Sequence, residues 1–178
     1  MRRLLACLLV FVAAGCGSGA ERLTIYLPQR LGPEGPAGQR VPVLMPTERE
    51  RRETMSAARQ AVLEVMSGPT PAERRSGYLD AIPPSTRLVG VRLGGDLATV
   101  ELAGKEPNYL GSAAIVYSVT EQTSLQRVRL LLDGEPCCVY THQATPWPGA
   151  LERRTFHGWT GEPCPLRTYP DAVRCRAG

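Results

Sequence analysis

Hydrophobic and polar residues alternate most regularly between residues 87 and 102, in the run RLVGVRLGGDLATVEL. Alternation with a period of two residues is typical of strands, and the Gly94-Gly95-Asp96 segment tolerates the positive φ of a tight turn. The pattern therefore predicts a β-hairpin with one buried face. That face is predicted to consist of Val89, Val91, Leu93, Ala98, Val100 and Leu102. An isolated hairpin is marginal in water, so other elements must cover it.

Hydrophobic alternation, turn residues and helix-capping residues predict the remaining elements. Short strands are expected at 23–27 and 41–45, and a longer one at 126–132, followed by an Asp133-Gly134 turn and a returning strand at 135–141. Thr47 and Glu50 have the spacing of a capping box, which predicts a helix from there to about Met66. A second helix is expected at 112–121, with Ser112 as its N-cap.

Residues 1–15 resemble a bacterial lipoprotein signal peptide. Arg2 and Arg3 precede an apolar run over 4–14, and small residues stand just before Cys16. About eleven apolar residues are too few to span a bilayer. We therefore expect Cys16 to be lipidated and the protein to be anchored to the cell membrane on its extracytoplasmic face, with 16–21 as a flexible linker. An ordinary secretory signal with an incidental Cys16 is the alternative.

Charge gives little indication of a nucleic-acid partner. The formal net charge is +4, and removal of Arg2 and Arg3 with the signal leaves 4 − 2 = +2. A nucleic-acid-binding domain would be expected to carry a clustered basic face, which this balance does not indicate. The hydrophobic content of 43% suits one globular domain with appendages.

A series of segments in the middle of the chain resembles the sporulation and spore germination domain called GerMN. The segments are Gly68-Pro69-Thr70, IPPSTRL at 82–88, DLATV at 96–100, IVYSVT at 115–120 and VRLLLDG at 128–134. The resemblance implies an α/β (α+β) domain over 22–141, with two helices packed on a small mixed β-sheet, similar to ring-building modules. It also implies a bacterial lipoprotein without known catalytic activity. This sequence holds one copy, whereas some members have two.

Residues 142–178 lie outside that resemblance and form a proline- and cysteine-containing extension. With Cys7 removed and Cys16 lipidated, the remaining cysteines are Cys137, Cys138, Cys164 and Cys175. An even number in an exported chain predicts disulfides. Because neighbours in a strand face opposite ways, we discount a bond between Cys137 and Cys138. Two pairings remain, Cys137 with Cys164 and Cys138 with Cys175, or the crossed alternative, and either would staple the extension to the domain.

Zinc is an alternative use of these four cysteines, with His142 and His157 as further ligands. The spacing lacks the usual paired knuckles and export favours oxidation, so we predict no metal and no cofactor. The sequence also contains no nucleophile elbow, zinc-protease helix or phosphate-binding loop. Loop carboxylates such as Glu106 are expected to be solvated. We therefore predict no catalytic residues and no enzymatic activity.

Two functional hypotheses follow. In the first, the protein is a lipid-anchored, non-catalytic interaction or assembly module of the cell envelope, related to sporulation or germination, that docks on a protein partner or on a second copy. In the second, it binds a small ligand such as a cell-wall fragment in a pocket beneath the extension. That pocket would be lined by Trp147, Trp159, Tyr140 and Phe156. An unpaired strand edge would favour the first hypothesis, and a deep aromatic pocket the second.

Overall fold

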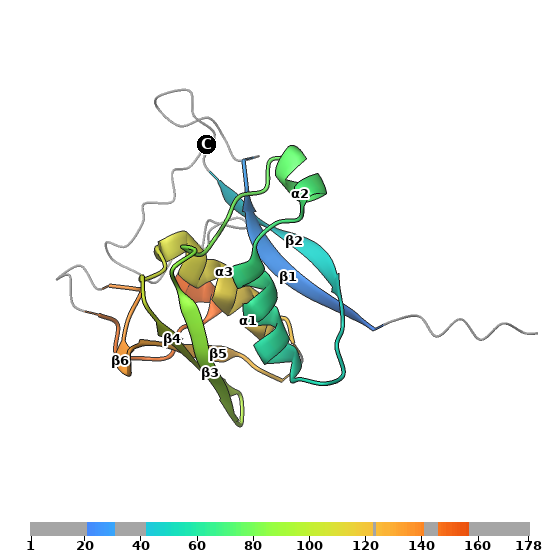
Figure 1. Ribbon diagram of the computed structural model, residues 1–178. Coiled ribbons are helices and arrows are strands. Elements are labelled where there is room, and N and C mark those ends of the chain that lie inside the picture. Colours follow the sequence, from blue (N-terminus) through green and yellow to red (C-terminus); the bar gives the residue numbers. More distant parts are fainter. Residues whose placement is uncertain (1–20, 31–41, 123, 141–145, 157–178) are drawn as a thin grey trace, which may run out of the picture.

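The computed structural model describes residues 21–30, 42–122, 124–140 and 146–156 (Figure 1). The elements in chain order are β1 (Arg22–Gln29), β2 (Val43–Glu50), α1 (Ala57–Ser67), α2 (Pro71–Arg75), β3 (Arg87–Gly94), β4 (Leu97–Ala103), α3 (Tyr109–Thr120), β5 (Arg127–Leu132), β6 (Glu135–Pro136) and the 3-10 helix η1 (Arg153–Phe156). β1 and β2 form an antiparallel pair, and the other sheet has the order β3-β4-β5-β6. Since β4 and β5 are parallel, that sheet is mixed. The predicted α/β class is confirmed.

Several sequence-based expectations concern residues outside the described part. These are the signal peptide 1–15, Cys16, the linker up to residue 20, His142, His157, Trp159, Cys164 and Cys175. They stay predictions. Within the described residues, no helix has the length and apolarity needed to cross a membrane.

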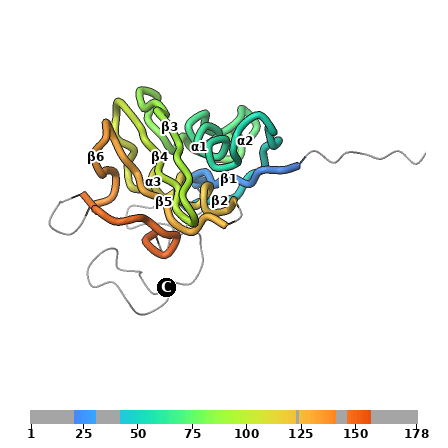
Figure 2. Tube along the Cα trace, turned by 90° about the horizontal axis from the view of Figure 1, so that it is seen from below, coloured from blue at the N-terminus to red at the C-terminus, as the bar shows by residue number. Residues whose placement is uncertain are grey.

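Helix α3 lies at the centre of the fold and is buried on all sides from Gly111 to Val119. It contacts α1, β1, β5 and η1. The Ser118 hydroxyl donates to the Ala114 carbonyl at 2.6 Å and accepts the Tyr26 N–H at 2.9 Å, so this buried polar group is satisfied. Figure 2 shows β6 and α2 at opposite ends of the molecule, as in Figure 1.

The predicted hairpin is confirmed as β3 and β4, but only β4 buries its apolar residues as expected. Ala98, Val100 and Leu102 are all fully buried. Val89 and Leu93 on β3, by contrast, are 56% and 52% exposed. The predicted continuous buried face is therefore wrong on the β3 side.

An irregularity in the strand pairing explains this difference. Leu88 pairs with Leu102 and Gly90 with Glu101, so Val89 is an extra residue without a partner on β4. Such a bulge shifts the alternation of the strand by one residue. Leu93 stands beside the turn of the hairpin, and this turn extends past the end of α1 (Figure 1).

The predicted start of the first long helix is also wrong. Thr47 and Glu50 belong to β2, and α1 begins after Ser56, whose side chain accepts the Arg59 N–H. The buried Gln60 side chain holds the intervening turn. Its Oε1 accepts the Arg52 N–H at 2.7 Å, and its Nε2 donates to the Glu50 carbonyl at 2.6 Å. The second helix likewise begins earlier than predicted, with Asn108 instead of Ser112 as its N-cap.

A charged cluster around Glu73 joins β2, α1 and α2. Arg49 of β2 donates from both terminal guanidinium nitrogens to the Glu73 carboxylate, at 2.8 and 2.9 Å, and also pairs with Glu64 of α1 at 3.5 Å. Thr70 and Glu73 form a reciprocal capping box at the start of α2. Burial alone would raise the pKa of Glu73, but hydrogen bonds from Arg49, Thr47 and Thr70 outweigh it and lower the pKa to about 2.

This lowered pKa predicts a specific acid sensitivity. The pKa of Glu73 falls from 4.5 to about 2 on folding, so its ionised form stabilises the fold above pH 4.5 and that contribution is lost as the pH falls toward 2. The contribution is of the order of 3 kcal/mol. Urea unfolding of wild type and Glu73→Gln should therefore differ most near neutral pH and converge in acid.

Glu53→Gln is the matched control, because Glu53 is exposed. It should leave the free energy of unfolding within about 0.5 kcal/mol of wild type at each pH. A Glu73→Gln defect that stays constant down to strong acid would contradict the argument.

Candidate functional site

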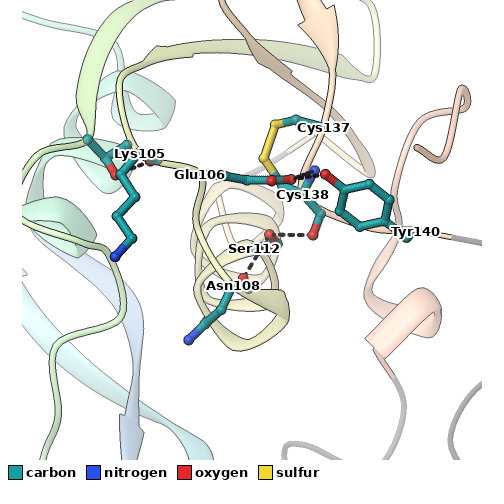
Figure 3. Close-up of a disulfide and its surroundings, with 8 residues drawn as sticks. Lys105, Glu106, Asn108, Ser112, Cys137, Cys138 and Tyr140 are labelled. Carbon is teal, nitrogen blue, oxygen red and sulfur yellow. Dashed lines mark hydrogen bonds between the residues drawn. A yellow bond between two sulfur atoms is a disulfide. The ribbon is translucent and has the colours of Figure 1, made fainter. Parts of the chain in front are cut away.

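Glu106, in the loop between β4 and α3, brings together two parts of the chain. The Cys138 N–H donates to Glu106 Oε1 at 2.7 Å, and the Tyr140 hydroxyl donates to the same oxygen at 2.6 Å (Figure 3). The Ser112 hydroxyl of α3 donates to the Cys138 carbonyl at 3.1 Å. These bonds hold the segment after β6 against the N-terminal end of α3.

A cavity of about 410 Å³ lies beside this carboxylate, lined by residues 106–109 and 138–140. Its volume is in the range of sites that bind small molecules. The hydrogen bond to Glu106, together with partial burial and the nearby charge, raises the pKa of Tyr140, so its phenol stays a donor at neutral pH. Burial raises the pKa of Tyr109 to about 12. The cavity therefore combines one carboxylate with two neutral phenols.

Cys137 and Cys138 are bonded to each other, which corrects our expectation that they pair with the extension (Figure 3). The expectation assumed a strand over 135–141, in which neighbouring side chains point apart. β6 covers only Glu135–Pro136, and Cys138 has a φ of 75°, so strand alternation does not apply to the two cysteines. Neither of them is then available to Cys164 or Cys175, which lie outside the described residues.

The disulfide also bears on metal binding. In the described residues, ligand atoms of Glu106, Cys137 and Cys138 lie within 4.8 Å of one another. Cysteine binds metals as a thiolate, and two sulfurs bonded to each other offer none. The oxidised cluster therefore does not act as a soft-metal site.

The described part of the extension, 146–156, packs against the domain. Phe156 is fully buried, with its ring 4.9 Å from that of Tyr109. Leu151 exchanges two backbone hydrogen bonds with Val128 of β5, at 2.8 and 2.6 Å. Of the aromatic residues predicted to line a pocket, Tyr140 does border the cavity, whereas Phe156 fills the core.

A second candidate site is the outer edge of β3, which we call the β3 edge and define as residues Val89–Leu93. In the part of the chain that the structure describes, β3 lies at the end of its sheet and pairs with β4 alone. In the described residues the exposed large hydrophobic side chains are Val89, Leu93 and Tyr140, two of them on this edge. Strand β2 instead carries Pro46 and the consecutive charged residues Glu48, Arg49 and Glu50, which discourage pairing.

Glu106 is the site residue that sequence reasoning missed. We expected it to be solvated, but it is half-buried and bonded to two donors. Cys138 and Tyr140 are 32 and 34 residues away from it in sequence. No local pattern signals such contacts.

Comparisons with known proteins agree with this fold. A protein-family model described as "Sporulation and spore germination" (Germane) matches residues 24–138. The solved tandem GerMN domains of the sporulation protein GerM from Bacillus subtilis are 17% identical, with a TM-score of 0.60, over 74% of this chain and 45% of that chain. The first GerMN domain of the same protein is 18% identical, with a TM-score of 0.52, over 75% of this chain and 98% of that chain. No curated protein matches this sequence.

The cysteine pairing can be tested by tryptic mapping without reduction. Trypsin places Cys137 and Cys138 together in peptide 130–153, whereas Cys164 falls in peptide 155–167 and Cys175 in 175–176. We expect peptide 130–153 to be unlinked and lighter by two hydrogen atoms than after reduction, because its two sulfurs are bonded to each other. A peptide 130–153 joined to 155–167 or 175–176 would restore the stapled pairing.

Proposed function

Since this chain belongs to the sporulation and spore germination family, we propose that it is a lipid-anchored, extracytoplasmic envelope protein whose domain serves as a non-catalytic protein-interaction module. The observation that carries the proposal is the β3 edge. The non-catalytic part follows the family resemblance, which implies no catalytic residue. The family description favours a role in sporulation or germination.

The β3 edge suits a partner that contributes an extended segment. A strand with a free edge offers backbone N–H and C=O groups for strand addition. β5 lacks such an edge, because β6 and Leu151 occupy its outer side. On β3, the exposed side chains of Val89 and Leu93 add apolar surface that a partner would remove from water.

Membrane attachment is the part of the proposal that rests on the sequence before residue 17. In a bacterial host that lipidates proteins, the full-length chain should fractionate with membranes and carry the mass of a lipid on Cys16. Cys16→Ser should lose both properties, because the acylated group is absent. Cys7→Ser, which changes a cysteine within the apolar run, is the matched control and should retain both. Membrane retention of Cys16→Ser without a lipid would contradict anchoring through Cys16.

The β3 edge can be tested by site-specific photo-crosslinking in native membranes. A photoreactive amino acid at Val89 or Leu93 should give a reproducible adduct with an envelope protein. The same amino acid at Arg75, an exposed position on α2, should give none. An adduct of twice the chain mass would identify a second copy as the partner. Adducts of equal yield at all three positions would contradict a specific β3 interface.

A charged substitution on the β3 edge provides an independent test of the interface. Leu93→Asp should lower the yield of the Val89 adduct about tenfold or more, because a carboxylate would be buried against the partner. Its melting temperature should stay close to that of wild type, since Leu93 is exposed. An unchanged adduct yield would show that Leu93 lies outside the interface.

The cavity beside Glu106 supports a second candidate function, the binding of a small envelope molecule.

A further inference from the structure

The Glu106 carboxylate differs from the other half-buried acids of the described chain in having no arginine or lysine partner. Each of the other half-buried acids forms an ion pair with an arginine: Glu64, Glu73, Asp96, Glu101 and Glu152. The two donors to Glu106 are a backbone N–H and a phenol, which are neutral. Partly buried charge is normally balanced by an opposite charge. Among the described residues, the balancing cation of Glu106 is missing.

The neighbouring groups within the described ranges do not supply that cation. Lys105, the only lysine in the chain, directs its amine away from the Glu106 carboxylate (Figure 3). The N-terminal end of α3 contributes about half a positive charge at most. The Asn108 side chain already accepts the Gly111 N–H of the first turn, at 2.8 Å. Counting the described residues, a net negative charge therefore remains at the cavity.

We propose that the cavity beside Glu106 binds a primary ammonium group carried on an aliphatic chain. This proposal rests on the second candidate function above and is independent of the β3 edge. The ammonium would bind to the carboxylate, and its aliphatic chain would lie against Val139, Pro107 and the ring of Tyr140. An ammonium near an aromatic ring gains further electrostatic attraction.

The hydrogen bonding of Glu106 favours an ammonium over other cations. Oε1 already accepts two hydrogen bonds, which leaves Oε2 for a ligand. A guanidinium binds best when both carboxylate oxygens are available, whereas an ammonium acts as a point charge. A hard metal ion would require several oxygen ligands, and of the described residues Glu106 alone brings a carboxylate to this cavity.

Full-length protein in detergent allows a direct test by calorimetric or NMR titration. The probe is Nα-acetyl-lysine methylamide, and the neutral control of similar shape is Nα-acetyl-norleucine methylamide. We expect the lysine probe to bind at least tenfold more tightly than the norleucine probe. Glu106→Gln should weaken lysine binding at least tenfold, because the amide oxygen can still accept both internal hydrogen bonds but carries no charge.

The matched control is Glu135→Gln, which removes an exposed acidic charge near the cavity but not within it. It should leave lysine binding within twofold of wild type. Tyr140→Phe provides a second variant, which keeps the ring and removes one donor to Glu106. It should weaken binding less than Glu106→Gln does, and the melting temperatures of all variants should be compared with that of wild type.

The ammonium could belong to a lysine side chain or to a lipid headgroup. A vesicle-binding experiment with Cys16→Ser protein, which lacks the proposed anchor, distinguishes these two sources. Vesicles containing phosphatidylethanolamine, compared with pure phosphatidylcholine, report a lipid headgroup. Glu106-dependent binding to these vesicles or to the lysine probe would support the proposal. Equal binding of the lysine and norleucine probes, undiminished binding by Glu106→Gln, or no binding of either ammonium source would overturn it. Binding of N-acetylglucosamine in their place would overturn the ammonium assignment and preserve the small-ligand function.

Discussion

The enclosure of α3 is the constraint on which the rest of the structure depends. A helix that is apolar all round cannot leave a face in water, so α1, β1, β5 and η1 must all contact it. Its buried hydroxyls remain satisfied because Ser118 donates to the Ala114 carbonyl one turn earlier in the chain and Ser112 donates to the Cys138 carbonyl. A buried hydroxyl without a partner would cost free energy that this packing has to supply. The polar residues of α3 are therefore compatible with the core only through these bonds.

The same enclosure determines which surfaces stay available to other molecules. At one end of α3, Ser112 binds the Cys138 carbonyl and so places the segment that borders the cavity. At the other end, the Arg153 guanidinium donates to the Tyr117 carbonyl and the Thr120 hydroxyl, at 3.1 and 2.8 Å, and closes the core. In the sheet, α3 packs on β5 whereas β3 contacts α1. The outer edge of β3 is thus left where the helical cover ends, and the bulge turns Val89 into solvent.

Elements that depend on neighbouring residues in the sequence could be predicted, and elements that depend on contacts with distant parts of the chain could not. The Asp133-Gly134 turn was predicted correctly because both residues tolerate the positive φ values of 52° and 88° that they adopt. The spacing Thr-x-x-Glu occurs at Thr47 and again at Thr70, but only the second forms a capping box. Thr47 pairs with Ile25 in the β1–β2 sheet, whereas Thr70 is followed by Pro71 at the first helical position, which favours a helix start. Pairing with β1 therefore decides the first case.

The candidate site depends still more on tertiary structure. Strand alternation does not hold at Cys137 and Cys138 because β6 covers only Glu135–Pro136, and the last backbone bond to β5 runs from the Cys137 N–H to the Leu130 carbonyl, at 3.3 Å. With a φ of 75°, Cys138 then leaves the strand direction and donates its N–H to Glu106. An extended φ at Cys138 would redirect the chain that follows it, including Tyr140, and the carboxylate would lose the Tyr140 hydroxyl as a donor. The disulfide, the positive φ and the carboxylate beside the cavity are consequently parts of one arrangement, and the contacts that join Glu106 to Cys138 and Tyr140 span more than thirty residues of sequence.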